Sequence, residues 1–124
     1  MKKVIIRKLS EDFGSFDRLE AWYFENFFSR LKGLMFKKNI SINQAGIFVN
    51  KNENIVDSAI HMLFMNFDIA VFWLDKKNTI VDKKIAKKWG LIYYPHVKSQ
   101  KILETHTDLF EKLQIGEKLI IENL

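Results

Sequence analysis

An almost continuous apolar stretch, residues 59–74, constrains the fold of this chain more than any other part of the sequence. It is rich in Ile, Val, Phe and Trp, which favour β-strands, and such runs are typical of strands buried on both faces. His61, Asn66 and Asp68 interrupt the run, which is also short for a membrane-spanning helix. We therefore predict two buried strands here, divided near Asn66 and Asp68.

Shorter strand-like segments lie on both sides of this stretch. The pattern of β-branched and apolar residues predicts strands over residues 3–9, 45–50, 79–86, 101–104 and 118–122. Polar and glycine-containing segments predict turns at residues 51–54, at residues 76–78 and at Gly116. Residues 39–44 and 89–97 have the character of loops, and a short helix is expected over about residues 107–113.

The strongest helical signal precedes these central strands. Apolar residues recur at helical spacing in Leu19, Tyr23, Phe27 and Leu31. Asp17 and Glu20 have the spacing of a capping box, and Gly33 suits the left-handed turn that often ends a helix. We predict one main helix over about residues 18–32, with its wide apolar side packed on a sheet.

Many short strands and one main helix indicate an α+β, β-rich fold. The expected architecture is a compact antiparallel or mixed sheet with the helix packed on it, and closure of the sheet into a small barrel is the alternative. The length of 124 residues fits a single domain over residues 1–124, and the sequence has no internal repeat, linker or low-complexity segment.

Composition excludes several chemistries. The sequence has no cysteine, which rules out disulfide bonds, iron–sulfur clusters, thiolate zinc sites and cysteine nucleophiles. It also has no nucleophile-elbow motif and no phosphate-binding glycine loop. The apolar run near the amino terminus ends at Arg7 and Lys8, too soon for a secretory signal. We expect a soluble cytoplasmic protein that does not enter a membrane.

The formal net charge is +5, and many of the lysines occur in doublets, namely Lys37-Lys38, Lys76-Lys77, Lys83-Lys84 and Lys87-Lys88. Positive charge permits binding to nucleic acid. Lysine, however, is less suited than arginine to contacting a base or phosphate through two hydrogen bonds. Solvated turns and protected strand edges explain the doublets as well. Nucleic-acid binding is therefore the lowest-ranked of the functions we consider.

His61 is the most informative single residue, because it is a polar ring inside an apolar segment. On a strand it shares a face with Ala59, Leu63 and Met65. A buried histidine satisfied by backbone or a carboxylate is the more common explanation. The functional explanation is an imidazole in a pocket that binds a ligand or transfers a proton.

The sequence contains two further histidines, His96 and His106. Neither forms with the other or with His61 the close spacing that is typical of metal ligands, so we expect neither a metal nor another cofactor. Met35, Met62 and Met65 accompany the phenylalanines and suit the filling of a core, although they could also line an apolar cavity.

Three segments resemble the Domain of Unknown Function 192 family. Residues 30–36, Arg-Leu-Lys-Gly-Leu-Met-Phe, match its R-x-x-G-L-M-F signature, and residues 60–75 resemble its H-T-F-F-M-R-F-P-I-D-V-V-F-L-D block. Residues 102–104 and 115–119 resemble its V-L-E-L-x-x-G and V-G-D ending. The resemblance covers about residues 30–122 and implies a compact β-rich domain with few helices, but it implies no activity.

The chain departs from the family pattern at several positions. Asn66 stands where the family usually has arginine, Asp68 where it has proline, and Ala70 where it has aspartate. If that arginine and aspartate form a polar pair in other members, this chain has lost the pair and any activity that depends on it.

These observations give one preferred function and two alternatives. We expect a small binding or accessory domain whose pocket near His61 accepts a small molecule or a peptide, with candidate binding residues His61, Arg30, Phe64, Met65, Glu104 and Asp75. Arg30 follows the family signature and suits a buried ion pair with Glu104 or Asp75. The first alternative is an enzyme that uses His61 as general acid or base. The second is a nucleic-acid binder that uses the lysine doublets.

Overall fold

The computed structural model describes residues 2–8, 18–24, 38–62, 65–90 and 92–123. Two of the candidate binding residues, Arg30 and Phe64, lie outside these ranges, as do Gly33 and most of the expected main helix. The described elements, in chain order, are β1 (Lys3–Lys8), β2 (Leu19–Phe24), β3 (Gln44–Asn54), η1 (Val56–Ser58), β4 (Ile60–His61), β5 (Ile69–Leu74), β6 (Ile80–Ala86), β7 (Ile92–Tyr93), β8 (Ser99–Thr105), η2 (Thr107–Leu109) and β9 (Leu119–Asn123).

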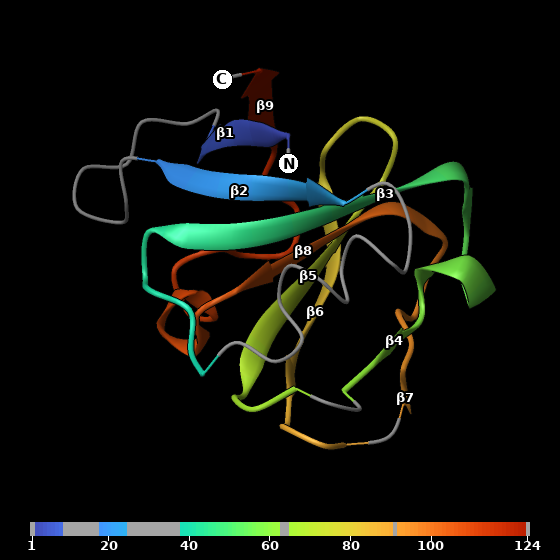
Figure 1. Ribbon diagram of the computed structural model, residues 1–124. Coiled ribbons are helices and arrows are strands. Elements are labelled where there is room, and N and C mark those ends of the chain that lie inside the picture. Colours follow the sequence, from blue (N-terminus) through green and yellow to red (C-terminus); the bar gives the residue numbers. More distant parts are fainter. Residues whose placement is uncertain (1, 9–17, 25–37, 63–64, 91, 124) are drawn as a thin grey trace.

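The strands form one large mixed sheet and one small sheet (Figure 1). The large sheet has seven strands in the order β6-β5-β8-β3-β2-β1-β9, and β4 pairs with β7 in the small one. Strands β2 and β3 run parallel, and the other described pairs run antiparallel. The predicted β-rich architecture is therefore confirmed, and the sheet is of the mixed kind.

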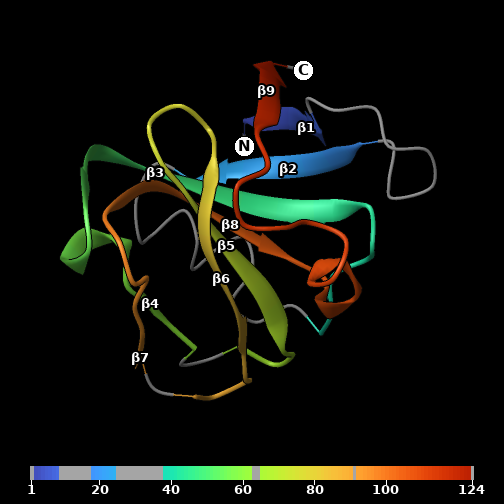
Figure 2. The ribbon, with the colours of Figure 1, turned by 180° about the vertical axis from the view of Figure 1, so that it is seen from behind.

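The large sheet is not closed into a barrel. Its outer strands, β6 and β9, lie at opposite ends of the strand order, and Figure 2 shows the chain before β9 crossing in front of the sheet near β6. An isolated bridge joins Thr79 to Lys118, and the Ile80 amide donates to the Glu117 carbonyl at 2.9 Å. Within the described residues, this contact joins the two ends locally without a continuous ladder between β6 and β9.

The prediction of a main helix is wrong at its start, because Leu19–Phe24 is strand β2. The helices among the described residues are the two three-residue 3-10 turns η1 and η2. In β2, Leu19 and Ala21 belong to the core on one face of the sheet, whereas Phe24 belongs to the core on the other. Apolar residues on both faces of a strand, as in β2 apart from the exposed Glu20, can imitate one side of a helix. The backbone partners offered by β1 and β3 decide between the two.

The predicted division of residues 59–74 is confirmed, because β4 and β5 are separate strands. Every residue of β5 is buried. Its alternate side chains Ala70, Phe72 and Leu74 enter the core on one face, and Ile69, Val71 and Trp73 enter the core on the other. This double burial explains why the sequence of β5 lacks the alternation of a half-exposed strand.

Several predicted boundaries need correction. The turn expected at residues 51–54 is wrong, because β3 continues to Asn54 with an irregularity in its pairing to β8 after Val49. The loop expected over residues 89–97 contains the short strand β7, and the helix expected over residues 107–113 is only the 3-10 turn η2. The turn at residues 76–78 is confirmed, with Asn78 at a φ of 67°.

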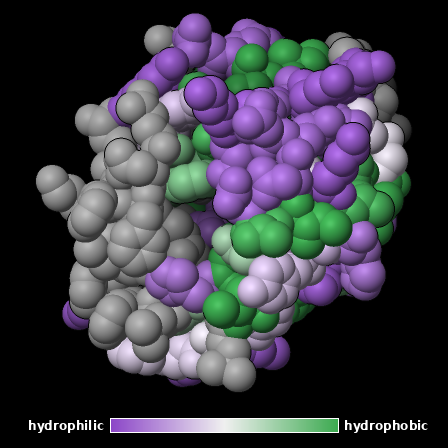
Figure 3. Space-filling view, turned by 90° about the vertical axis from the view of Figure 1, so that its right-hand side faces the viewer, coloured by the Kyte–Doolittle hydropathy of each residue, from purple (hydrophilic) through white to green (hydrophobic). Residues whose placement is uncertain are grey.

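None of the helices in the described ranges is long and apolar enough to cross a membrane. The side of the protein that carries η1, β4 and β7 bears a band of hydrophobic surface below a hydrophilic region (Figure 3). Exposed apolar side chains on these elements and beside them include Ile55, Val56, Ile92 and Tyr94. Val56 is the most exposed of them, at 75%.

Candidate functional site

A small hollow lies beside His61, and we call it the His61 hollow. It encloses about 90 Å³ and is lined by Phe48, Asp57, Ala59, Ile60, His61, Ile102 and Glu104. These residues come from β3, from η1 and β4 with the residue between them, and from β8. The fold therefore brings His61 and Glu104, which are far apart in the sequence, to one cavity. The imidazole of His61 and the carboxylates of Asp57 and Glu104 lie there among apolar side chains.

Glu104 occupies the middle of the large sheet. In β8 it pairs with Gly46 of β3 on one side and with Val71 of β5 on the other, and it is only 2% exposed. Because side chains alternate along a strand, Glu104 shares a face with Ile102, which belongs to the same core as Val71 and Trp73. A carboxylate at such a position is costly to bury and is therefore a strong candidate for a specific role.

The wall of the hollow that leads to His61 is fixed by a hydrogen-bond network around the buried residue Ser58. The Trp73 indole Nε1 donates to the Ser58 carbonyl at 2.7 Å, and the Ser58 hydroxyl donates to the Ser99 carbonyl at 2.9 Å. The Asn50 amide donates to the Asp57 carbonyl at 2.8 Å and to the Ser58 hydroxyl at 3.2 Å. These bonds anchor η1 to β3, β5 and β8 and so set the path of the chain into β4.

The other candidate binding residues are placed differently. Met65 is fully buried in the core with Met62, and it is not among the residues that line the His61 hollow. Asp75 follows β5 in the turn to β6, where its Oδ1 accepts hydrogen bonds from the amides of Lys77 at 2.8 Å and Thr79 at 3.0 Å. The structure therefore brings His61 together with Glu104 but gives Asp75 a turn-forming role.

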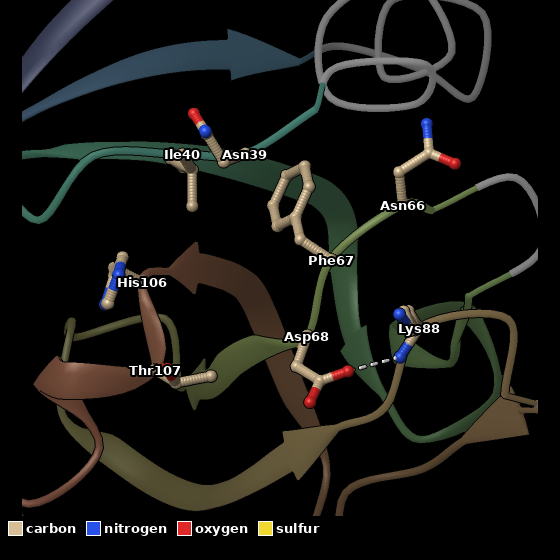
Figure 4. A pocket seen from close by; sticks show the side chains of 8 residues that line it. All are labelled: Asn39, Ile40, Asn66, Phe67, Asp68, Lys88, His106 and Thr107. Carbon is tan, nitrogen blue, oxygen red and sulfur yellow. Dashed lines mark hydrogen bonds between the residues drawn. The ribbon is translucent and has the colours of Figure 1, made fainter.

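A larger hollow lies where four segments meet at the ends of strands, and we call it the strand-end hollow (Figure 4). It encloses about 360 Å³ and is lined by Asn39, Ile40, Asn66, Phe67, Asp68, Lys88, His106 and Thr107. The segments precede β3 and β5 and follow β6 and β8. Sequence reasoning did not single out this site. Polar residues next to buried strands were its signal, and Asn66 and Asp68 were used to divide those strands and were noted as departures from the family pattern.

Two side chains of the strand-end hollow are held by short hydrogen bonds to the backbone. Asp68 Oδ1 accepts from the Lys88 amide at 2.8 Å, which joins the segment before β5 to the segment after β6 (Figure 4). His106 Nδ1 accepts from the Asp108 amide at 3.0 Å. Because Nδ1 accepts, the neutral ring carries its proton on Nε2, and Nε2 is then a donor.

Two lysines of the doublets, Lys83 and Lys84, form contacts within the chain. Lys83 Nζ donates to the Phe110 carbonyl at 2.7 Å and lies 4.3 Å from the centre of the Phe110 ring, and Lys84 Nζ donates to the Tyr94 carbonyl at 2.8 Å.

Burial lowers the pKa of Lys101, against the opposing effect of Asp75 and Glu53. In the described part of the chain, no group of three or more histidine, aspartate or glutamate side chains could hold a metal ion.

Comparison with known sequences identifies the same family as the three motifs. The family model for Domain of Unknown Function 192, described as an uncharacterized ACR, matches residues 9–121. The resemblance is therefore confirmed, and it begins before the first motif. Asn66 and Asp68, two of the positions that depart from the family pattern, line the strand-end hollow, whereas Ala70 is buried in β5.

Similar curated proteins are named UPF0127 proteins. One from Thermococcus kodakarensis is 42% identical over 93 residues, which are 75% of this chain and 57% of that protein. One from Thermococcus gammatolerans is 39% identical over 75% of this chain and 59% of its own length. One from Pyrococcus furiosus is 32% identical over 82% of this chain and 86% of its own length. The chain thus spans less than two-thirds of these two Thermococcus proteins.

Two solved structures share the fold at low sequence identity. A provisionally assigned transcription regulator from Sinorhizobium meliloti has a TM-score of 0.81 and 14% identity, with 97% of this chain and 92% of that chain covered. A protein of unknown function from Novosphingobium aromaticivorans has a TM-score of 0.74 and 13% identity, with 95% and 83% covered. These likenesses extend to the fold alone.

Proposed function

Because this chain belongs to the Domain of Unknown Function 192 family, which is uncharacterized, we propose a function from its own site: a small binding or accessory domain that holds a small molecule or a peptide segment at the His61 hollow. One observation carries the proposal, namely that His61 and Glu104 line the same hollow from separate elements. A few polar groups converging in an apolar cavity are typical of ligand sites.

The size of the hollow limits what can enter it. Ligand sites commonly enclose roughly 300–1,000 Å³, whereas the His61 hollow encloses about 90 Å³. It therefore accepts one end of a ligand, a polar group that forms hydrogen bonds with the imidazole or the carboxylate. The rest of the ligand would lie on the neighbouring surface, where Ile55 and Val56 are exposed immediately before Asp57.

A thermal-shift screen of metabolites and short peptides tests this proposal. We expect at least one compound to raise the melting temperature of the wild type, and to raise that of His61→Ala much less. His106→Ala is the matched control, since it removes an imidazole from the strand-end hollow instead. His61→Gln keeps a side chain that forms hydrogen bonds and fills much of the volume, whereas His61→Ala loses both the hydrogen bonds and the volume. A screen in which no compound raises the melting temperature of the wild type more than that of His61→Ala would contradict the proposal.

An acid–base enzyme is the second candidate, and the presence of His61 and Glu104 in one hollow favours it. A carboxylate near an imidazole can orient the ring and stabilise its protonated form. Chromogenic ester and phosphate substrates, assayed with the wild type and His61→Ala, test this function. Turnover that is lost in His61→Ala supports it, and turnover of equal rate in both proteins argues against it.

The lysine doublets give weaker support to nucleic-acid binding. The ammonium groups of Lys83 and Lys84 already donate to carbonyl oxygens of the chain, which reduces their availability for phosphates. The Sinorhizobium meliloti protein carries a regulator's name, but at 14% identity the likeness concerns the fold. Failure to bind duplex DNA or RNA at low salt would dismiss this function. A cytoplasmic location stays a prediction of the sequence.

A further inference from the structure

The strand-end hollow differs from the His61 hollow in size and chemistry. Its volume of about 360 Å³ lies within the range of sites that enclose a whole small molecule, roughly 300–1,000 Å³. Its lining comes from four separate segments, two of which are joined by the hydrogen bond between the Lys88 amide and Asp68. A cavity held together by such bonds can present its polar groups in fixed positions.

The charges in this lining balance. Asp68 contributes one carboxylate and Lys88 one ammonium group, and the remaining polar side chains are amides, a hydroxyl and an imidazole. Beside the lining, Lys87 Nζ lies 3.7 Å from Asp68 Oδ2 and Asp108 Oδ2 lies 3.7 Å from His106 Nδ1, which adds one charge of each sign. An anion such as phosphate is usually bound by several cationic groups or backbone amides, and a cation by several carboxylates. Neither surplus is present among these residues. The lining therefore favours a ligand without net charge.

The same lining offers both donors and acceptors of hydrogen bonds. The neutral His106 ring donates from Nε2, because its Nδ1 accepts from the Asp108 amide. The Thr107 hydroxyl can donate and accept, and the Asp68 carboxylate accepts. Hydroxyl groups on a ligand are matched to such a mixture, because each hydroxyl is itself both donor and acceptor.

An apolar surface accompanies these polar groups. The Phe67 ring projects between the segment of Asn39 and Ile40 and the pair formed by Asp68 and Lys88 (Figure 4). Phe67 packs against the buried core that includes Ile40, and this packing holds its ring in place. An aromatic ring with an aliphatic neighbour provides contact for the C–H face of a ring that carries hydroxyl groups at its edge.

From this arrangement we propose that the strand-end hollow binds a small, neutral, polyhydroxylated molecule, of the class of monosaccharides and cyclic polyols. Asp68, His106 and Thr107 form hydrogen bonds with its hydroxyl groups, and Phe67 contacts its apolar face. This site is separate from the His61 hollow, with which it shares no lining residue.

Titration of the isotope-labelled protein, followed by amide nuclear magnetic resonance, tests the proposal. The probes are D-glucose, D-ribose and myo-inositol, with inorganic phosphate as the charged comparison. We expect at least one neutral probe to give saturable shifts at the amides of Asp68, Lys88 and Thr107, with an affinity in the millimolar range or tighter. Phosphate should leave these amides unshifted.

Three variants locate the binding. Asp68→Asn keeps the oxygen that accepts from the Lys88 amide but loses the charge, and Thr107→Val removes a hydroxyl at nearly constant shape. Each is expected to weaken the probe's affinity by about tenfold, the effect of one lost hydrogen bond to a charged or well-placed group. Glu122→Gln, at an exposed residue of β9 that lines neither hollow, should bind the probe as the wild type does.

Three results would overturn the proposal. The first is the absence of saturable shifts with all three neutral probes. The second is a response of these amides to phosphate and to none of the neutral probes, which would assign an anion to the hollow. The third is unchanged affinity in both Asp68→Asn and Thr107→Val, which would place the ligand elsewhere.

Discussion

The indole Nε1 of Trp73 donates a 2.7 Å hydrogen bond to the carbonyl oxygen of Ser58, and both residues are fully buried. This bond joins the fully buried strand β5 to the end of η1, three residues before His61. The position of the candidate imidazole thus depends on a contact deep inside the core. Stability and the geometry of the His61 hollow are linked through this contact.

Trp73→Phe should therefore destabilise the protein. The variant leaves the Ser58 carbonyl without its donor and opens space in the core, and the expected loss in the free energy of unfolding is about 2–4 kcal/mol. Urea denaturation measures it. Ser58→Ala is the matched variant, because it removes the hydroxyl bond to Ser99 but keeps the carbonyl that accepts from Trp73. A loss in Trp73→Phe no larger than that of an exposed substitution would contradict the role of this bond.

Asp82 holds the chain before β8 against β6. Its carboxylate, in a residue only 5% exposed, accepts from the Lys83 amide at 2.8 Å and from the His96 amide at 2.8 Å, with His96 Nδ1 also at 2.8 Å. Asp82→Ala should lower the free energy of unfolding by about 2–3 kcal/mol, because two backbone donors lose a charged acceptor. Glu122→Gln, which affects only an exposed ion pair with Arg7, should cost less than about 1 kcal/mol. Equal losses in the free energy of unfolding for the two variants would show that the hydrogen bonds of Asp82 do not stabilise the protein more than an exposed ion pair does.

Asn78 adopts a left-handed conformation in the turn between β5 and β6, with φ at 67°. Its side-chain oxygen is buried and has no hydrogen-bond partner within the described residues. Asn78→Gly removes the strain of a side chain at positive φ and the unpartnered oxygen. It should leave the free energy of unfolding unchanged or raise it by up to about 1 kcal/mol. Asn78→Val should lower it by about 1–2 kcal/mol, because a β-branched side chain disfavours this conformation. Thermal unfolding of the two variants distinguishes these directions.

Lys101 gives a pH dependence with a defined sign. Burial lowers its pKa in the folded protein below the unfolded value of 10.5, so in the interval between them the unfolded chain binds more protons. Stability from this group therefore rises as pH increases through that interval, and the cost of burying the charge is fully present at lower pH.

Lys101→Met should consequently stabilise the protein at neutral pH. The gain over the wild type should shrink as the pH approaches 10.5, where the wild-type side chain loses its charge. Urea denaturation at a series of pH values measures the difference, and Lys51→Met on the exposed part of β3 serves for comparison. A gain that grows with pH would contradict the direction assigned to Lys101.

The sequence by itself determined the β-rich class, the family and the two strands within residues 59–74. Local composition is sufficient for these, because strand-forming residues buried on both faces leave a continuous apolar signature in β5. It also identified His61 and Glu104 as candidate residues, although it could not show that they share a hollow.

Tertiary structure decided what local pattern could not. Residues 19–24 have apolar spacing compatible with a helix, and backbone pairing with β1 and β3 makes them a strand instead. The strand-end hollow forms where four segments meet, so the sequence of any one segment could not predict it. Hydrogen bonds between distant strands and the burial of both sheet faces are collective properties of the folded chain, and they outweigh local preference where the two conflict.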